Sequence, residues 1–94
     1  MIPFTHVDGN TRVRVVLYAL STCAWCRKTK RLLEEIGVGF DFVDVDLLSG
    51  TEGREAEDAM YRWNPRGSFP TLVINDERCI VGFDEKEIRK LAEE

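Results

Sequence analysis

The sequence predicts an α/β fold whose elements follow the order β-α-β-α-β-β-α. In the earlier part of the chain, apolar runs typical of strands alternate with segments whose apolar residues recur at helical spacing, which is the pattern of βαβ units. Further on, two short apolar runs flank a polar turn, which is the pattern of a β-hairpin. One more helical segment follows the hairpin.

The first strand is expected at residues 12–19, where nearly continuous apolar character is typical of a central strand buried on both faces. A helix should follow at residues 24–36 and end at Gly37. Its buried stripe is expected to consist of Cys26, Thr29, Leu32, Leu33 and Ile36. The second strand is expected at residues 40–46. Because a helix links the two strands, they should be parallel, with a right-handed crossover.

Four further elements are expected, in this order: a helix at 52–64, strands at 69–74 and 78–81, and a helix at 85–92. Pro65 and Gly67 stop the first of these helices, and Asp84 can cap the last one. The two strands should form a hairpin around the polar turn at 75–77.

The 94 residues are enough for one domain, which we place at residues 12–94 behind a polar N-terminal extension at 1–11. Within the extension, residues 5–7 either pair with the following strand as a short hairpin or fray.

Composition argues against several function classes. The net charge of −4 gives no overall basic field for nucleic acid or anionic lipid, and no apolar run approaches the roughly 20 residues of a membrane span. The first residues lack the basic start and apolar run of a signal peptide. Three cysteines, an odd number, do not make a secreted disulfide framework. We therefore expect a cytoplasmic protein without nucleic-acid or membrane partners.

Cys23 and Cys26 lie where the first strand gives way to the first helix. At a helix N-terminus, the unpaired N–H groups and the positive end of the dipole favour a thiolate. Cys23 is therefore the expected nucleophile of thiol–disulfide exchange, and Cys26, one turn further on, is the expected resolving thiol. Arg27, Lys28 and Lys30 are expected to add positive charge that stabilises the thiolate.

The alternative for this cysteine pair is half of a structural zinc site. Such a site needs about four ligands, and the chain offers only Cys79, His6 and scattered carboxylates, so we expect no metal. Cys79 alternates with apolar neighbours in a strand and is either a small core residue or a regulatory thiol. No role is expected for His6.

The element order resembles the glutaredoxin branch of the thioredoxin fold. The match includes the position of Cys23 and Cys26, Pro70 at the start of the third strand, and residues 82–84 before the last helix. It covers nearly all of residues 12–94 and looks closest to short glutaredoxin-like and NrdH-like redoxins. The resemblance implies a thioredoxin-like fold, with a four-stranded mixed sheet flanked by three helices, and thiol–disulfide oxidoreductase activity.

The resemblance also implies a substrate-binding surface. Pro70 is expected to be cis and to face the cysteines, with the backbone of Phe69 pairing with an extended substrate. An ordinary trans proline at a strand edge is the alternative. Gly82, Phe83 and Asp84 should end a strand and cap a helix, and this helix start should hold a substrate carboxylate.

Two features beside the cysteines are open to two interpretations each. Trp25 either contacts partners from the surface or packs over the site. The cluster of Arg27, Lys28, Lys30 and Arg31 forms either a solvated helix face or a surface that steers anionic partners.

The chain departs from the resembled family at several positions. Many glutaredoxins have Pro-Tyr between the cysteines, where this chain has Ala24 and Trp25. Members that use glutathione usually carry a lysine three residues before the first cysteine, and Leu20 stands there, which favours a reductase protein as electron source. Residues 68–70 replace the common threonine-valine-proline. Asp84, by contrast, matches a position that holds the γ-glutamyl end of glutathione.

The resemblance thus implies a monomeric, cytoplasmic electron donor that reduces the disulfide of a client protein through Cys23 and Cys26. No cofactor is required, and electrons come from a reductase protein or from glutathione. The alternative function is a glutathione-dependent carrier of an iron–sulfur cluster, with Cys23 as the protein ligand. The presence of Cys26 and of Leu20 counts against this alternative.

Overall fold

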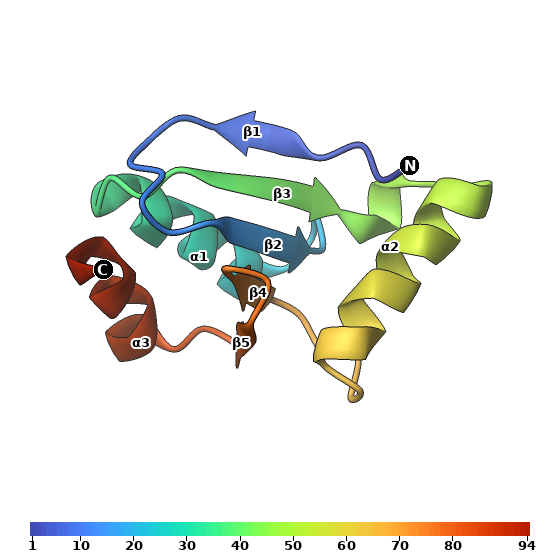
Figure 1. The fold of residues 1–94 in the computed structure, drawn as a ribbon. Helices are drawn as coiled ribbons and strands as arrows, with labels where there is room; N and C mark the ends of the chain where they lie inside the picture. Colours follow the sequence, from blue (N-terminus) through green and yellow to red (C-terminus); the bar gives the residue numbers. More distant parts are fainter.

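The computed structural model describes residues 1–94 and shows a β-sheet with helices on both faces (Figure 1). The strands are β1 (Thr5–Val7), β2 (Val15–Ala19), β3 (Phe40–Asp44), β4 (Thr71–Ile74) and β5 (Arg78–Val81). The helices are α1 (Ala24–Glu35), α2 (Gly50–Trp63) and α3 (Glu85–Lys90), with short 3₁₀ helices at Val45–Leu47 and Leu91–Glu93. The predicted α/β fold, with three helices around a mixed sheet, is confirmed.

The sheet contains five strands in the order β1-β3-β2-β4-β5, one more than predicted. Strands β2 and β3 are parallel and are linked by α1, as expected, whereas the other three pairs are antiparallel. The additional strand is β1, and it pairs with β3 rather than with β2, which follows it in sequence. Because β2 already lies between β3 and β4, neither of its edges is free, and residues 5–7 pair instead with the outer edge of β3.

Strand β2 lies at the centre of the hydrophobic core, and all of its residues are buried. Successive side chains of a strand point to opposite faces of the sheet. Accordingly, Val15, Leu17 and Ala19 join the core on one face, and Val16 and Tyr18 join the core on the other. The prediction of a strand buried on both faces is confirmed.

Each face of the sheet is covered by its own helices. On one face, α1 contributes Leu32 and α3 contributes Ile88 to the core. On the other face, α2 contributes Ala56 and Met60. Cys26 belongs to the first of these cores and its side chain is fully buried. The packing of α1 on the sheet therefore sets the depth of the second cysteine.

The observed element boundaries differ modestly from the predicted ones. The second strand ends at Asp44 because the chain turns into the 3₁₀ helix at Val45–Leu47. Strand β4 begins only at Thr71, since Pro70 has no N–H to donate to the ladder. The hairpin turn lies at the predicted position, and Asn75 and Asp76 have φ of 54° and 53°, which these residue types tolerate.

None of the three helices is both long and apolar enough to cross a lipid bilayer.

Candidate active site at the start of helix α1

Cys23 is the N-cap residue of helix α1. Its backbone is extended, with φ −89° and ψ 118°, and its Sγ accepts a hydrogen bond from the backbone N–H of Cys26 at 3.2 Å. The thiol is partly exposed. Its sulfur therefore lies where a helix presents unpaired N–H groups and the positive end of its dipole.

Cys26 lies one turn further along the helix, with no exposed surface. Burial, reinforced by the interaction with Cys23, raises the pKa of the Cys26 thiol to about 12. The positive charge of Lys30 acts in the opposite direction but is a smaller influence. At neutral pH, Cys26 therefore holds its proton. The two thiols differ in accessibility as a nucleophile and a resolving cysteine would: Cys23 is partly exposed and Cys26 is buried.

The turn before Cys23 is anchored by a contact that was not predicted from the sequence. The carboxylate of Asp46 accepts a hydrogen bond from the backbone N–H of Ser21 at 2.8 Å and another from its hydroxyl. These two hydrogen bonds lower the pKa of Asp46. The residues are far apart in sequence, so no local pattern could have revealed the pair.

The loop before strand β4 approaches the sheet through a cis peptide bond between Phe69 and Pro70, as predicted. A buried side chain, Asn64, supports this loop: its Nδ2 donates to the carbonyl of Ser68 at 3.2 Å and to the hydroxyl of Thr71 at 3.0 Å. The Thr71 hydroxyl in turn donates to the Ser68 carbonyl at 2.8 Å. This network was not predicted from the sequence, although a polar residue directly before the helix-stopping Pro65 was the available signal.

A shallow groove of about 170 Å³ brings together most of the residues that were predicted to bind substrate. It is lined by Trp25, Phe69, Pro70, Gly82 and Phe83. The N–H of Gly82 donates to the carbonyl of Pro70 at 2.8 Å, which fixes the two segments against each other. Asp84, the sixth predicted residue, does not line this groove. Its side chain instead caps helix α3 by accepting from the Glu87 N–H at 3.2 Å.

Trp25 lies at the surface and also packs against a neighbouring ring. Its side chain is 55% exposed, so it forms part of the surface. At the same time, its ring stacks on that of Phe83 with centroids 5.6 Å apart, and the Nζ of Lys28 lies 4.6 Å from the Trp25 ring centroid. The stack forms one wall of the groove and couples the start of α1 to the segment before α3.

The predicted thiolate-stabilising residues occupy different environments. Arg27 is exposed, and its guanidinium donates to the Ser21 carbonyl at 3.4 Å. Lys28 is exposed beside Trp25. Lys30, by contrast, is mostly buried, forms an ion pair with Asp44 at 3.0 Å and covers the ring of Phe42. Much of its charge is therefore neutralised by its own partner.

A second groove, of about 300 Å³, lies on the other side of Phe69. Its lining is largely apolar and includes Leu20, Met60 and Tyr61, with the acids Asp46 and Glu57 beside them. The position at which glutathione-using relatives are expected to carry a lysine therefore faces acidic groups. No cluster of three or more His, Cys, Asp or Glu side chains is arranged to hold a metal ion.

Comparison with known proteins decides the family. The glutaredoxin family model matches residues 15–79, more than half of the chain, including both cysteines of the pair and Pro70. The chain belongs to the glutaredoxin family. A glutaredoxin-like 8.6 kDa protein encoded in a rubredoxin operon of Clostridium pasteurianum is 37% identical over 79 residues, which cover 84% of this chain and 97% of that protein.

Solved structures agree with this assignment. The chain is 53% identical to a glutaredoxin from Methanosarcina mazei, with a TM-score of 0.82 over 95% of this chain and 86% of the other. It is 52% identical to methanoredoxin from Methanosarcina acetivorans, with a TM-score of 0.79 over 84% and 82% of the two chains. NrdH-redoxin from Escherichia coli is 27% identical, with a TM-score of 0.68 over 83% and 93%. The predicted glutaredoxin-like and NrdH-like relationship is confirmed, and this chain is a glutaredoxin-family redox protein with a dithiol pair.

Proposed function

We propose that this glutaredoxin reduces protein disulfides, with Cys23 as the nucleophile and Cys26 as the resolving thiol. The observation that carries the proposal is the contrast between the two sulfurs. That of Cys23 is accessible and accepts a backbone N–H at the helix start, whereas that of Cys26 is buried and keeps its proton. Thiol–disulfide exchange by a cysteine pair requires an exposed thiolate for the first attack and a second thiol that stays protonated until the mixed disulfide has formed.

The reaction proceeds in two exchanges. The Cys23 thiolate attacks one sulfur of the client disulfide, the client S–S bond breaks, and the departing client thiolate takes up a proton. Cys26 then loses its proton and attacks the sulfur of Cys23, which breaks the mixed disulfide and releases the second client thiolate. Two electrons and the one proton of Cys26 pass from the cysteine pair to the client, the second client thiolate takes up a proton from solvent, and the pair is left as a disulfide.

The client segment is proposed to lie in the groove at Phe69 and Pro70. The backbone of Phe69 is available there for main-chain pairing with an extended peptide. Trp25, Gly82 and Phe83 complete the walls and offer apolar contact area to the client, which supports their assignment as substrate-binding residues. Asp84 contributes by holding the start of α3 in place beside the groove.

For the electron source we favour a reductase protein over glutathione. Glutathione is an anion at neutral pH, and the groove beside Leu20 presents the carboxylates of Asp46 and Glu57 instead of a lysine. The similar E. coli NrdH-redoxin is described as a glutaredoxin-like protein with a thioredoxin-like activity profile, which supports a protein-directed role. We place the protein in the cytoplasm as a monomer that needs no cofactor.

Trapping separates the roles of the two cysteines. Cys26→Ser should accumulate a mixed disulfide between position 23 and a model client, detected by mass spectrometry, because the second exchange is blocked. Cys23→Ser should accumulate none. Trapping by Cys23→Ser alone would reverse the assignment.

The electron source is tested in parallel by regenerating the wild-type protein with millimolar glutathione or with an NADPH-linked reductase. Faster turnover with the reductase is expected. Equal or faster turnover with glutathione would overturn the choice of reductant without affecting the roles of the cysteines.

A further inference from the structure

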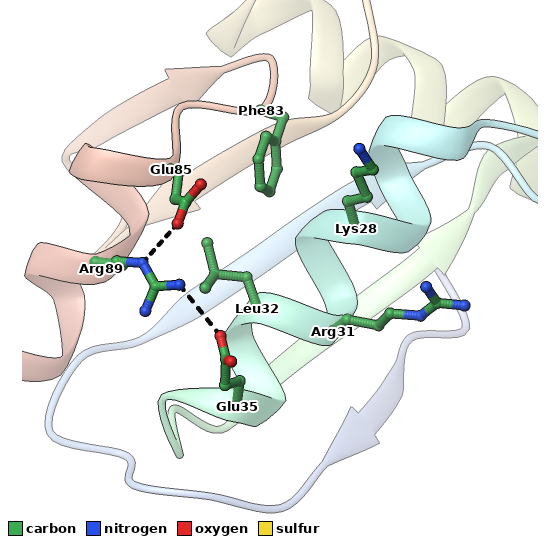
Figure 2. Close-up of a pocket in the computed structure, with 7 residues that line it drawn as sticks. All are labelled: Lys28, Arg31, Leu32, Glu35, Phe83, Glu85 and Arg89. Carbon is green, nitrogen blue, oxygen red and sulfur yellow. Dashed lines mark hydrogen bonds and ion pairs between the residues drawn. The ribbon is translucent and has the colours of Figure 1, made fainter.

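Beside the proposed active site, a cleft separates helices α1 and α3 (Figure 2). Its volume is about 460 Å³, and the apolar side chains of Leu32 and Phe83 line it. Phe83 also lines the groove at Pro70, so the two depressions meet at one residue. A segment that leaves the Pro70 groove past Phe83 therefore enters this cleft.

The acids of the cleft are already paired. Arg89 from α3 donates to Glu85 at 2.8 Å and to Glu35 of α1 at 3.3 Å, and Figure 2 shows its guanidinium between the two carboxylates. Lys28 and Arg31 also line the cleft, but neither forms an ion pair with an acid. In Figure 2 Lys28 lies on the side of α1 that faces Phe83, whereas Arg31 extends away from α3. Their charges are thus free to meet an external carboxylate.

Arg27 extends this free charge towards Cys23. It is exposed and has no acidic partner, and its guanidinium donates only to the carbonyl of Ser21. We call Arg27, Lys28 and Arg31 the basic rim. The first turn of α1 contains no acid, although acids there would interact favourably with the helix dipole. The stability of α1 therefore does not account for the composition of the basic rim.

We propose that the basic rim binds acidic side chains that flank the disulfide of the client protein, a recognition step that rests on the proposed function. Lys28 and Arg31 lie five and eight residues beyond Cys23, which corresponds to roughly 7 and 12 Å along the helix axis. An extended peptide covers about 3.3 Å per residue. The preferred acids therefore lie about two to four residues from the client cysteine that Cys23 attacks.

A protein segment suits this surface better than a polyanion. The chain as a whole carries a net charge of −4, which repels nucleic acid and anionic membranes at a distance. The basic rim is local and spans little more than one helical turn, which matches one or two carboxylates next to a disulfide. The exposed ring of Trp25 under Lys28 adds apolar contact area for the same segment.

The test measures single-turnover reduction of synthetic peptides by the chemically reduced protein, so that no reductase is needed. The peptides share one intramolecular disulfide and differ in their flanks: two Asp three residues from the attacked cysteine, two Asn at the same positions, or two Asp eight residues away. At low ionic strength we expect the first peptide to react about three- to tenfold faster than the other two. This ratio should approach one at about 0.5 M NaCl.

Matched variants locate the effect. Lys28→Gln/Arg31→Gln should bring the Asp-to-Asn rate ratio close to one. Arg12→Gln/Arg54→Gln removes the same net charge from residues that do not line the cleft and should keep the wild-type ratio. Lys28→Glu/Arg31→Glu should instead prefer a peptide with two Lys at the near positions.

A wild-type ratio of one with all peptides reduced would overturn the recognition step alone, as would an acidic preference that survives Lys28→Gln/Arg31→Gln. Failure to reduce any peptide would contradict the proposed function itself, and the recognition step with it.

Discussion

Helices α1 and α3 lie side by side, but the residues at their N-termini differ (Figure 1). Both begin with a side chain that accepts the N–H three residues on, at 3.2 Å in each case. In α3 the acceptor is the carboxylate of Asp84, whereas in α1 it is the sulfur of Cys23. The first helix residue is Glu85 in α3 and Ala24 in α1.

The two helices also differ in the charged residues of their first and last turns. Helix α3 carries acids in its first turn and bases in its last, which complements the helix dipole. Helix α1 has no acid in its first turn and no base in its last, where Glu34 and Glu35 lie instead. Helix α3 therefore uses its N-terminal field for stability, and α1 leaves that field available to a thiolate. The difference supports the proposed role of Cys23 as the nucleophile.

The largest expected effect comes from Cys23→Ser. Reduction of a model protein disulfide should fall about a thousandfold or more, because the hydroxyl is not a competent nucleophile in this exchange. The free energy of unfolding should change by less than about 1 kcal/mol, since serine is a preferred N-cap residue. Activity assays and urea denaturation check the two expectations together. A large loss of stability would mean that Cys23 has a structural role that the capping geometry does not explain.

The next effect concerns pH. An unfolded chain ionises Cys26 near its ordinary value of 9, whereas the folded protein holds the pKa at about 12 because the thiol is buried. Below pH 9 the thiol is protonated in both states, and its contribution to the free energy of unfolding is fully present. As pH rises from 9 towards 12 this contribution is lost, because unfolding then releases the Cys26 proton. The reduced protein should lose up to about 1 kcal/mol per pH unit in this window.

Denaturation of the reduced protein between pH 8 and pH 11 measures this slope. Cys26→Ala should make the slope shallower, while Cys79→Ala, which leaves Cys26 in place, should keep the wild-type slope. An unchanged slope in Cys26→Ala would show that burial does not suppress ionisation of Cys26.

A smaller effect is expected at the cap of α3. Asp84→Ala removes the acceptor for the Glu87 N–H and should lower the free energy of unfolding by about 1 kcal/mol. Asp84→Asn keeps a capping oxygen and should remain within a few tenths of a kcal/mol of the wild type. Equal stability of the alanine and asparagine variants in urea denaturation would contradict a capping role.

The smallest effect is expected from substituting the first residue of each helix. Ala24→Glu places an acid at the exposed start of α1 and should stabilise the protein by about 0.3–1 kcal/mol, while slowing alkylation of Cys23 because a negative charge disfavours the thiolate. Glu85→Ala should destabilise by a similar amount, since it also loses the pair with Arg89. If Ala24→Glu left alkylation as fast as in the wild type, the helix field would not be what activates the sulfur.

Local patterns in the sequence were sufficient to predict the elements that carry the fold. The apolar run predicted β2 because a strand buried on both faces is apolar at nearly every position. The helical spacing predicted α1 because a helix that buries one stripe has apolar residues three or four positions apart. The place of β1 in the sheet was not predictable in the same way. Which edge residues 5–7 occupy depends on which edges other strands leave free, and that is a property of the assembled sheet.

The same distinction applies to the candidate site. The apolar run before Cys23 and the helical spacing after Cys26 predicted that the pair lies at the start of α1. The hydrogen bonds that anchor the surrounding loops were not predicted. Asp46 and Ser21 are far apart in sequence. Asn64 supports its loop through hydrogen bonds that form only when α2 and β4 are packed together. Single polar residues of this kind carry no periodic signal.

The most direct test of the contrast between the two cysteines is competitive alkylation of the reduced protein at pH 7. A sub-stoichiometric amount of iodoacetamide is followed by denaturation, complete labelling with an isotopically heavy form, and fragmentation of the peptide that contains both Cys23 and Cys26. The account predicts that nearly all of the light label is on Cys23 and almost none on Cys26. Equal labelling of the two sulfurs, or preferential labelling of Cys26, would contradict it.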